Sequence, residues 1–383
     1  PLLLLDLHIL KVLYPFVGDS IGGSHRSIIE LYNELKDSDI TPIFVLHKIG
    51  VLSELFDSLN IKYEHIPVKR LAGESPCIFK VFFSIVCNLF KLSKFIHKNR
   101  IDVVHGNDLR INLTWSLPTR LSSAFYLWHQ RSLMSPSILW KISTILADHF
   151  VTISQCVHDS LPSNISKSKK TLVLNPFNTK TYYKREASRK WINKLYGISK
   201  NDILFGYIGR LVDWKNVDFL IRCFKKYTTN SDALLHLIIV GTGNHEYVSS
   251  LKKLVYELEL ENFVTFTGFN SEPSRVISAF DLMLAPSNQE PFGRTIVEAM
   301  IQKTPVLAAC GGGHSEIIND GLTGRLYVHN DINSFIIQCD AYFSDSATKY
   351  EIVNQANAVA TLKYSSHTNA KNIINIYYQL LFS

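Results

Sequence analysis

Short apolar runs alternate with amphipathic helical patterns along the whole chain. The runs are apolar on both faces and rich in Val, Ile or Leu, which is typical of parallel strands buried between helices. In the first half, helical patterns such as Ser24–Leu35 and Ile78–His97 separate the predicted strands. Those strands are Lys11–Tyr14, Pro42–Leu46, Asp102–His105, Tyr126–His129 and His149–Ile153. Strand and helix in alternation predict a doubly wound α/β domain.

The alternation pauses at residues 163–189, which are polar and basic, and we interpret this stretch as a linker or hinge. A second α/β series follows, and two or three apolar helices then lead to Ser383. Its predicted strands are Ile203–Ile208, Leu235–Val240, Phe263–Thr267, Asp281–Ala285, Pro305–Ala309 and Arg325–Val328. The fold class is therefore α/β, with two tandem Rossmann-like domains at residues 1–178 and 179–365. Residues 366–383 form a C-terminal helix that could cross back to the N-terminal domain.

Open parallel sheets bind ligands beyond the carboxyl ends of their strands. Two such sheets facing each other would form a cleft between the domains. We therefore expect the functional side chains of this chain to lie directly after strands.

Composition narrows the class of protein. The chain has 383 residues, 46% hydrophobic and 19% charged, which excludes a disordered, collagen-like or low-complexity protein. The net charge of +7 permits an acidic substrate or an anionic surface. Because the excess is modest and no nucleic-acid-binding motif is present, we expect no nucleic-acid partner. The six cysteines have no metal-ligand spacing, so we expect core thiols in a reducing compartment and no zinc site.

Neither a signal peptide nor a transmembrane segment is evident, so we expect a cytosolic protein. The apolar start at Pro1–Leu5 is interrupted within a few residues by Asp6, His8 and Lys11. Residues 76–101 contain no acid but several Lys and Phe residues, and residues 109–147 also lack acids. Such basic, aromatic helices can lie on anionic lipid. The alternative is an ordinary core helix with a solvated face.

Glycine turns follow several predicted strands. Gly22-Gly23 opens the helix at Ser24, where free N–H groups attract a phosphate or sugar oxygen, although paired glycines also make plain turns. Gly209 places Arg210 after a strand, and Lys215 stands at the start of the next helix. The forked guanidinium of an arginine and the point charge of a lysine together suit the binding of a diphosphate. The alternative interpretation is that Arg210 and Lys215 are two solvated surface charges. Gly241-Thr242-Gly243 lacks the remaining glycine of a dinucleotide fingerprint and is interpreted as a turn.

Two acids stand out in the segment after the strand Asp281–Ala285. Glu290 lies in the loop, Gly293 opens a helix, and Glu298 falls inside that helix. A carboxylate accepts hydrogen bonds from hydroxyl pairs, so these two acids could hold two different diols. The alternative for Glu298 is an acid on a helix surface. After the next strand come Gly311-Gly312-Gly313 and Glu316, which could cap its helix.

The second half resembles the retaining glycosyltransferases of glycosyltransferase family 4 (glycosyl transferases group 1), which have the GT-B fold. The resemblance spans residues 203–328 in order and spacing. The residues that carry it are Tyr207-Ile208-Gly209-Arg210-Leu211 with Lys215, Val240-Gly241-Thr242-Gly243, Phe266-Thr267-Gly268-Phe269, Glu290 and Glu298, and Gly311-Gly312-Gly313 through Glu316 and Gly324. The first half resembles the family more faintly, through Gly22-Gly23, Asp102–His105 and Leu127-Trp128-His129.

The resemblance implies a nucleotide-diphosphate sugar as donor, no cofactor and a glycan or lipid-linked acceptor, in polysaccharide or lipopolysaccharide synthesis. It implies catalytic roles for His129, Arg210, Lys215 and Glu290. It implies that the donor is bound by Gly22, Gly23, Gly209, Arg210, Lys215, Gly268, Phe269, Glu290, Phe292, Gly293, Arg294, Thr295 and Glu298. Within this set, Arg210 and Lys215 match the diphosphate clamp and Glu298 matches the ribose binder. Asn216 departs from the usual Gly, and we expect little effect because the position starts a helix.

The resemblance puts His129 against the donor sugar, although His105 also ends a strand and competes for the role. The alternative for His129 is a buried, satisfied histidine. The family is thought to retain configuration by transfer on one sugar face, with the leaving diphosphate taking the acceptor proton. We identify no Asp-x-Asp motif of the kind that would hold Mg²⁺ against a diphosphate, so no metal is expected. The competing hypotheses are a GT-B nucleotide-sugar epimerase and a non-catalytic sugar-nucleotide-binding subunit.

Overall fold

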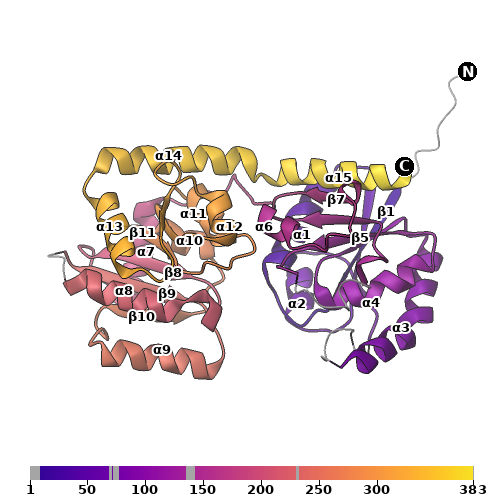
Figure 1. Cartoon of the computed structure of the whole chain (residues 1–383), viewed down its shortest axis with the longest axis horizontal. Helices are drawn as coiled ribbons and strands as arrows, with labels where there is room; N and C mark the ends of the chain where they lie inside the picture. The colour runs from indigo at the N-terminus through magenta and orange to yellow at the C-terminus, as the bar shows by residue number, and fades with distance from the viewer. Residues whose placement is uncertain (1–8, 69–70, 72–76, 135–142, 230–232, 383) are drawn as a thin grey trace, which may run out of the picture. The chain divides into compact units, whose positions relative to one another are not determined.

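The computed structural model describes residues 9–68, 71, 77–134, 143–229 and 233–382 of the chain. The chain divides into two units, each with its own parallel sheet. Unit 1 comprises Pro1–Phe177 together with Ser366–Ser383, and unit 2 comprises Asn178–Ser365 (Figure 1). The C-terminal helix α15 (Ser366–Phe382) packs against α1 (Gly23–Leu35) within unit 1. The expected return of the last helix to the N-terminal domain is thereby confirmed.

Unit 1 is built on seven parallel strands in the order β3-β2-β1-β4-β5-β6-β7. The strands are β1 (Leu10–Phe16), β2 (Ile40–Leu46), β3 (Glu64–His65), β4 (Val103–Gly106), β5 (Phe125–Gln130), β6 (His149–Thr152) and β7 (Lys170–Leu172). Among its described residues, the other helices of the unit are α2 (Val51–Ser58), α3 (Ile78–Asn99), α4 (Leu109–Arg120), α6 (Gln155–Asp159) and the 3-10 turn η1 (Lys167–Lys169).

The side chains of the unit 1 sheet alternate between two apolar cores. On β1, Leu13 joins the core under α3 and α4, whereas Val12 and Tyr14 join the core under α1, α2 and α15. This alternation follows from the pleat of a strand, whose successive side chains point to opposite faces. Because both faces are covered by helices, the strands are apolar throughout, as the sequence pattern predicted.

Two short strands were missed by the sequence analysis, β3 and β7, and both lie at sheet edges. Strand β7 falls inside the stretch that was interpreted as a linker, and α7 (Arg185–Tyr196) begins there as well, so that interpretation was wrong for these residues. All three residues of β7 are half-buried and its first residue is a lysine. An edge strand needs no apolar run and tolerates lysine, which is why the hydrophobic pattern did not reveal it.

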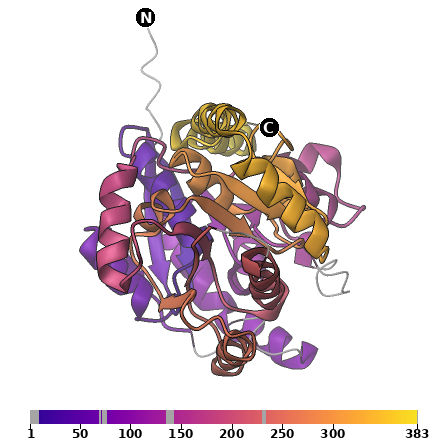
Figure 2. The same cartoon turned by 90° about the vertical axis from the view of Figure 1, so that its left-hand side faces the viewer.

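Unit 2 is built on six parallel strands in the order β10-β9-β8-β11-β12-β13. The strands are β8 (Ile203–Ile208), β9 (Leu235–Val240), β10 (Val264–Gly268), β11 (Leu282–Ala285), β12 (Val306–Ala309) and β13 (Arg325–Tyr327). Helices lie on both faces of this sheet (Figures 1 and 2). They are α7, α8 (Val217–Thr229), α9 (His245–Glu257), α10 (Pro273–Ser278), α11 (Arg294–Ile301), α12 (Gly312–Ile317), α13 (Ile332–Phe343), α14 (Ser346–Lys363) and the 3-10 turn η2 (Asp213–Lys215).

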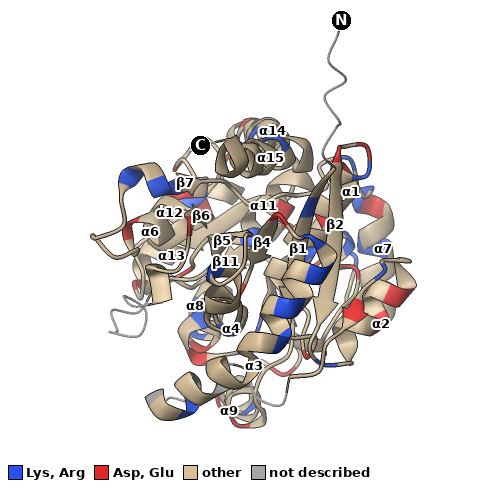
Figure 3. Cartoon of the chain, turned by 90° about the vertical axis from the view of Figure 1, so that its right-hand side faces the viewer, with Lys and Arg blue, Asp and Glu red and all other residues tan. Residues whose placement is uncertain are grey.

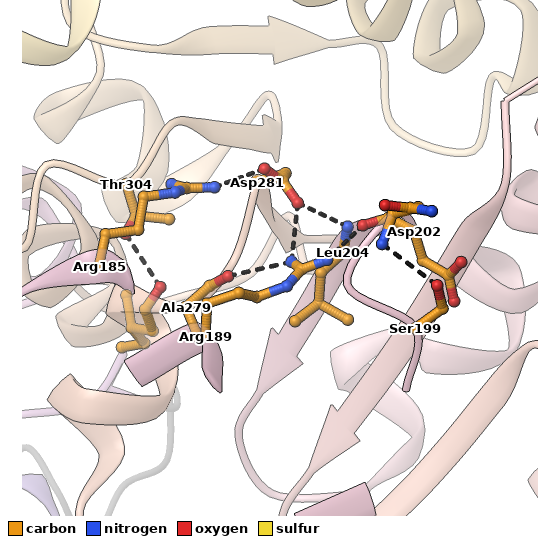
Figure 4. A network of polar contacts seen from close by, with 10 residues as sticks. Arg185, Arg189, Ser199, Asp202, Leu204, Ala279, Asp281 and Thr304 are labelled. Carbon is orange, nitrogen blue, oxygen red and sulfur yellow. Dashed lines mark hydrogen bonds and ion pairs between the residues drawn. The ribbon is translucent and has the colours of Figure 1, made fainter. Parts of the chain in front are cut away.

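An acid at the entrance to β11 ties α7 to the sheet of unit 2 (Figure 4). The carboxylate of Asp281 pairs with both Arg185 and Arg189 of α7, and it accepts a 2.7 Å hydrogen bond from the Leu204 backbone N–H. Arg189 also donates to the Asp202 backbone oxygen. One half-buried carboxylate therefore holds the first helix of the unit against the start of its central strands, and helps to fix β8 beside β11.

Both sheets have a topological switch point, where the strand order reverses. In unit 1 it lies between β1 and β4, and in unit 2 it lies between β8 and β11. The loops that follow these strands leave the sheet in opposite directions, which opens a crevice at the carboxyl edge. The predicted functional segments follow β1 and β5 in unit 1 and β8 and β11 in unit 2.

The cysteines differ from the expectation of a uniform set of core thiols. Only Cys223 and Cys339 are buried, whereas Cys77, Cys87 and Cys310 are exposed and Cys156 is half-buried; all six are free thiols. The expectation was therefore wrong for four of the six, because apolar neighbours in sequence do not determine which face of an element a residue occupies. Within the described ranges, none of the helices combines the length and apolar character that a bilayer crossing requires.

Candidate functional site

Two loops meet at the switch point of unit 2. One follows β8 and carries Arg210 and Lys215, and the other follows β11 and carries Glu290. The two strands are hydrogen-bonded neighbours, so residues far apart in sequence leave the sheet at the same point. The Lys215 ammonium forms an ion pair with the Glu290 carboxylate across this point. Their side chains are only 17% and 12% exposed, so the pair is largely shielded from solvent.

Trp214 joins the two predicted cations. The Lys215 ammonium lies 4.4 Å from the centre of the indole ring, and the Arg210 guanidinium carbon lies 5.8 Å from it. An indole face attracts cations within about 6 Å. Arg210 itself is exposed, and the indole therefore orients an arginine that faces solvent. Sequence analysis did not single out Trp214, although its place between two candidate cations was the available signal.

The loop around Glu290 has a backbone that depends on glycine. Gly293 precedes α11 with φ +104°, and a Cβ there would lie 2.9 Å from the His314 ring. Gly313 packs directly on the loop, and its N–H donates a 2.7 Å hydrogen bond to the Glu290 backbone oxygen. A Cβ at Gly313 would lie 2.2 Å from the Phe292 oxygen. The glycine run that opens α12 therefore supports the Glu290 loop by direct backbone contact.

Helix α11 places Arg294 and Glu298 one turn apart on the same face, with 3.8 Å between Arg294 Nη2 and Glu298 Oε1. The Glu298 side chain is 13% exposed, so it is not the freely solvated helix acid of the alternative interpretation. Thr295 lines a small pocket beside Lys215 and Glu290. The first turn of α11 thus lies beside this pocket, and the Glu298 carboxylate follows one turn further on.

The pocket lies at the mouth of β8 and β11. It is lined by Tyr207, Ile208, Lys215, Leu284, Ala285, Pro286, Ser287, Glu290, Thr295 and His314. Burial lowers the pKa of His314 to about 4, so its ring is neutral at physiological pH. The sequence analysis used Tyr207 only for the family resemblance and gave no site role to Tyr207, Ser287 or His314, because each occupies a position that an ordinary core or turn residue could fill.

Several predicted residues lie elsewhere. Gly268 ends β10, at the sheet edge two strands from β8; neither it nor the exposed Phe269 lines this pocket. Phe292 is buried and packs edge-on against Tyr364. Glu316 does not cap the start of its helix, because Gly311 is the N-cap of α12 and Glu316 lies in its last turn.

Asn216 stands at the start of α8, as expected. It directly precedes Val217, and its backbone oxygen accepts a 3.2 Å hydrogen bond from the Leu220 N–H. Its backbone is in the left-handed region, with φ +59°, where it follows the 3-10 turn η2. The left-handed region explains why glycine suits this position, and asparagine is among the few other residues that enter it readily. The Asn216 side chain donates a 2.9 Å hydrogen bond to the Asn330 side-chain oxygen, which helps to hold the turn that presents Lys215.

In unit 1, the glycine pair opens α1 directly after the loop that follows β1. Gly22 is the N-cap, and its N–H donates a 3.0 Å hydrogen bond to His25 Nδ1. The first turn of α1 contains no acid, and its N-terminus is the positive end of the helix dipole. Burial and the nearby Arg131 guanidinium lower the pKa of His25 to about 4.

His129 and His105 lie on neighbouring strands and are hydrogen-bonded to each other. His105 Nε2 is 3.0 Å from His129 Nδ1, and Arg131 Nη2 is 3.3 Å from the same His129 nitrogen. Arg131 is oriented by the side-chain oxygens of Asn107 and Asn175, at 2.9 and 2.7 Å. Both histidines are buried, and burial together with the Arg131 charge holds the pKa of each well below 6.5. The sequence analysis found both histidines but missed Arg131.

Taken separately, the two units offer different chemistry. Unit 2 presents two cations, an acceptor carboxylate and a helix start at one strand mouth, which suits an anion joined to a polyhydroxyl group. Unit 1 presents a helix start, an arginine and neutral imidazoles, which suits hydrogen bonding to uncharged oxygens. Among the described residues, no cluster of three His, Cys, Asp or Glu side chains could hold a metal ion.

Comparison with known proteins supports the resemblance noted in the sequence. The family model described as Glycosyl transferases group 1 matches residues 188–359. An uncharacterized glycosyltransferase of Methanocaldococcus jannaschii is 28% identical over 246 residues, which cover 62% of this chain and 61% of that protein. The capsular polysaccharide biosynthesis glycosyltransferase CapM of Staphylococcus aureus is 21% identical, covering 77% of this chain and 81% of that protein.

A solved structure covers nearly the whole chain. The crystal structure of HepE of Anabaena in complex with UDP-glucose has a TM-score of 0.83 at 21% identity, covering 97% of this chain and 100% of that one. This likeness establishes the GT-B fold for both units. The chain spans 61%, 53% and 41% of the lengths of the first three curated relatives that it matches.

Proposed function

We propose that this chain, which belongs to the glycosyl transferases group 1 family through residues 188–359 and has the GT-B fold, is a retaining glycosyltransferase. It transfers a sugar from a nucleotide-diphosphate sugar to a glycan or lipid-linked acceptor in the synthesis of a cell-surface polysaccharide. The observation that carries the proposal is the meeting of Arg210, Lys215 and Glu290 at the switch point of unit 2, inside the segment that matches the family.

The roles follow from charge. Breaking the bond between the anomeric carbon and the diphosphate oxygen leaves negative charge on the diphosphate. Fixed cations that already point at that oxygen stabilise the charge without reorganising, and this is the role we assign to Arg210 and Lys215. The Glu290 carboxylate accepts hydrogen bonds from sugar hydroxyls, and Glu298 accepts them from the ribose. Gly22 and Gly23 bind donor phosphate through the start of α1, and His129 contacts the donor sugar.

Retention follows if the acceptor attacks the face that the diphosphate leaves. The acceptor oxygen forms its bond to the anomeric carbon as the bond to the diphosphate oxygen breaks, and the acceptor proton passes to that diphosphate oxygen. The protein then supplies positioning and charge stabilisation rather than a covalent nucleophile.

Nucleotide sugars are expected to raise the melting temperature of the purified chain, because a ligand that binds only the folded state stabilises it. A thermal-shift screen over donors of different base and sugar identifies the donor. The anomeric configuration of the product, read by proton NMR with that donor and an acceptor panel, then tests retention. Release of an epimerised sugar nucleotide without acceptor would favour an epimerase, and binding without turnover on a broad panel would favour a non-catalytic subunit. Either result contradicts the proposal.

The exposed face of α3 supports a membrane-surface acceptor. Phe79, Phe82, Phe83 and Phe90 are between 65% and 84% exposed, whereas Leu92 and Ile96 of the same helix are buried in the core, so the outward face of α3 is aromatic. The helix carries lysines and no acid (Figure 3). Exposed aromatic rings with cations beside them suit the interface of an anionic bilayer. We therefore assign the protein to the cytoplasmic face of a membrane, docked through α3.

Replacing Phe82, Phe83 and Phe90 together by serine is expected to weaken binding to anionic vesicles by about a thousandfold or more, because each buried ring contributes roughly 1.5–3 kcal/mol. Co-sedimentation with vesicles of phosphatidylglycerol and phosphatidylcholine measures the change, and vesicles of phosphatidylcholine alone test the charge requirement. The matched control replaces Tyr256 and Leu362 by serine, since both are at least 71% exposed on other helices. Equal sedimentation of the wild type with both vesicle types would contradict the proposed docking of α3 on an anionic membrane.

A further inference from the structure

Four buried polar side chains form a continuous hydrogen-bonded row inside unit 1. The Tyr14 and Tyr377 hydroxyls are 2.7 Å apart, the Tyr377 hydroxyl is 2.6 Å from His105 Nδ1, and His105 Nε2 is 3.0 Å from His129 Nδ1. All four side chains are at most 3% exposed. Three of them come from the neighbouring strands β1, β4 and β5, and Tyr377 comes from the C-terminal helix α15.

The register of the sheet explains why these residues meet. Leu13 pairs with Val104, so Tyr14 and His105, one residue further on, share the opposite face. His105 pairs with Leu127, and His129 lies two residues beyond Leu127, on that same face. This face is the one that α15 covers with Ile373, Ile376 and Tyr377. The Tyr377 hydroxyl is a polar group within this otherwise apolar contact, so the packing of α15 does not by itself account for it.

The direction of the hydrogen bonds is determined at both ends of the row. Arg131 can only donate, so its guanidinium, 3.3 Å from His129 Nδ1, favours an acceptor at that nitrogen. His105 then donates from Nε2 and accepts at Nδ1 from the Tyr377 hydroxyl. At the other end, Tyr377 is the hydroxyl partner that the described residues offer Tyr14, so Tyr14 donates to Tyr377. The reverse order would leave the buried Tyr14 proton without an acceptor and would turn an N–H toward Arg131.

This order puts the proton of His129 on Nε2. That nitrogen is buried and has no hydrogen-bond partner among the described residues. A buried N–H without an acceptor is costly and rare in folded proteins, which points to an acceptor that arrives with a ligand. His105, by contrast, has both ring nitrogens occupied, so of the two histidines only His129 has an atom left for a ligand.

We infer that Tyr377 of the C-terminal helix is a positioning residue that acts through His105 to hold His129 as its Nε2–H tautomer, ready to donate to an oxygen of the bound sugar. The identity of the ligand rests on the proposed function, whereas the tautomer does not. Burial and Arg131 keep the pKa of both imidazoles well below 6.5, so the row consists of neutral rings at physiological pH.

Imidazole 15N NMR of the whole chain without ligand tests the tautomer directly. In the wild type, we expect His129 to carry its proton on Nε2 and His105 to do the same. In Tyr377→Phe, His105 loses the donor to its Nδ1, and a second tautomer of both rings is expected to become populated. In Tyr14→Phe, the Tyr377 hydroxyl still donates to His105, so the wild-type tautomers are expected to persist. Protonation of His129 on Nδ1 in the wild type would overturn the inference.

Turnover supplies the second readout. Tyr377→Phe is expected to lower kcat about tenfold with little change in KM for the acceptor. The reason is that the substitution disturbs only the hydrogen-bond donor at His129 Nε2. The matched control is Tyr378→Phe, the next residue on α15, whose ring is 37% exposed and stacks on Phe382. Equal spectra and equal kcat in the two variants would refute the role of Tyr377. A chain that shows the expected tautomers but transfers no sugar would refute the proposed function instead.

Discussion

Replacing Lys215 by alanine is expected to lower kcat for sugar transfer by about two orders of magnitude or more, the typical effect of one lost preorganised group. The ammonium is largely shielded, is held against the Trp214 ring and is paired with Glu290. Its removal takes away a fixed positive charge from the position we assign to the leaving diphosphate. Because the Glu290 carboxylate also loses this cation, the melting temperature should fall as well. Steady-state kinetics and thermal unfolding of the purified variant measure the two effects.

Arg210→Ala separates catalysis from folding. Arg210 is exposed and contacts the Trp214 ring, so its loss should change the free energy of unfolding by roughly 0.5 kcal/mol or less. The expected loss in kcat is nevertheless about two orders of magnitude. The matched control is Lys253→Ala, which removes an exposed cation paired with Glu257 on α9 and should leave kcat unchanged. Near-wild-type turnover in both Lys215→Ala and Arg210→Ala would overturn the diphosphate clamp.

Gly313→Ala is expected to destabilise the chain by roughly 3 kcal/mol, at the upper end of ordinary point substitutions. The added Cβ would lie 2.2 Å from the Phe292 oxygen and 2.5 Å from its Cα, and both of these atoms belong to the backbone. No side-chain rotation relieves such a contact, so the Glu290 loop or α12 must move. The hydrogen bond from the Gly313 N–H to the Glu290 oxygen should be lost, and donor affinity with it. Thermal unfolding with and without nucleotide sugar measures both.

A second glycine provides the control for this steric argument. Gly197 ends α7 in the left-handed region, with φ +68°, and a Cβ there would meet nothing within 4 Å. Gly197→Ala should therefore cost only the left-handed conformation, roughly 1–2 kcal/mol, and should leave donor affinity unchanged. If the two substitutions lowered the melting temperature equally, the packing of Gly313 under the loop would not be what holds Glu290.

The local pattern of the sequence was sufficient for the elements that form the centres of the two sheets. Ile203–Ile208 and Leu235–Val240 were predicted with the boundaries that β8 and β9 have, and the strands that carry His105 and His129 differ by one residue at each end. A strand covered on both faces must be apolar throughout, so its signal is contained in a few consecutive residues. The edge strands β3 and β7 carry no such requirement and were missed.

The candidate groups were also visible in the sequence, because glycine turns and charged residues directly after a strand are local features. What they contact was not visible. Lys215 and Glu290 are 75 residues apart, and His105 and Tyr377 are 272 residues apart. The left-handed backbone of Asn216 and the contact of Gly313 with the Phe292 backbone likewise depend on neighbours that cannot be identified from the local sequence.

The sequence by itself thus determined the fold class, the resemblance to a glycosyltransferase family and the set of chemical groups available at the strand ends. Only the tertiary structure decided the pairings: the Lys215–Glu290 pair, the cations on Trp214, and the row from Tyr14 to His129. The physical reason is that helix and strand preferences are properties of neighbouring residues, whereas these pairings depend on strand order and register. Strand order and register depend on how the whole chain buries its apolar faces.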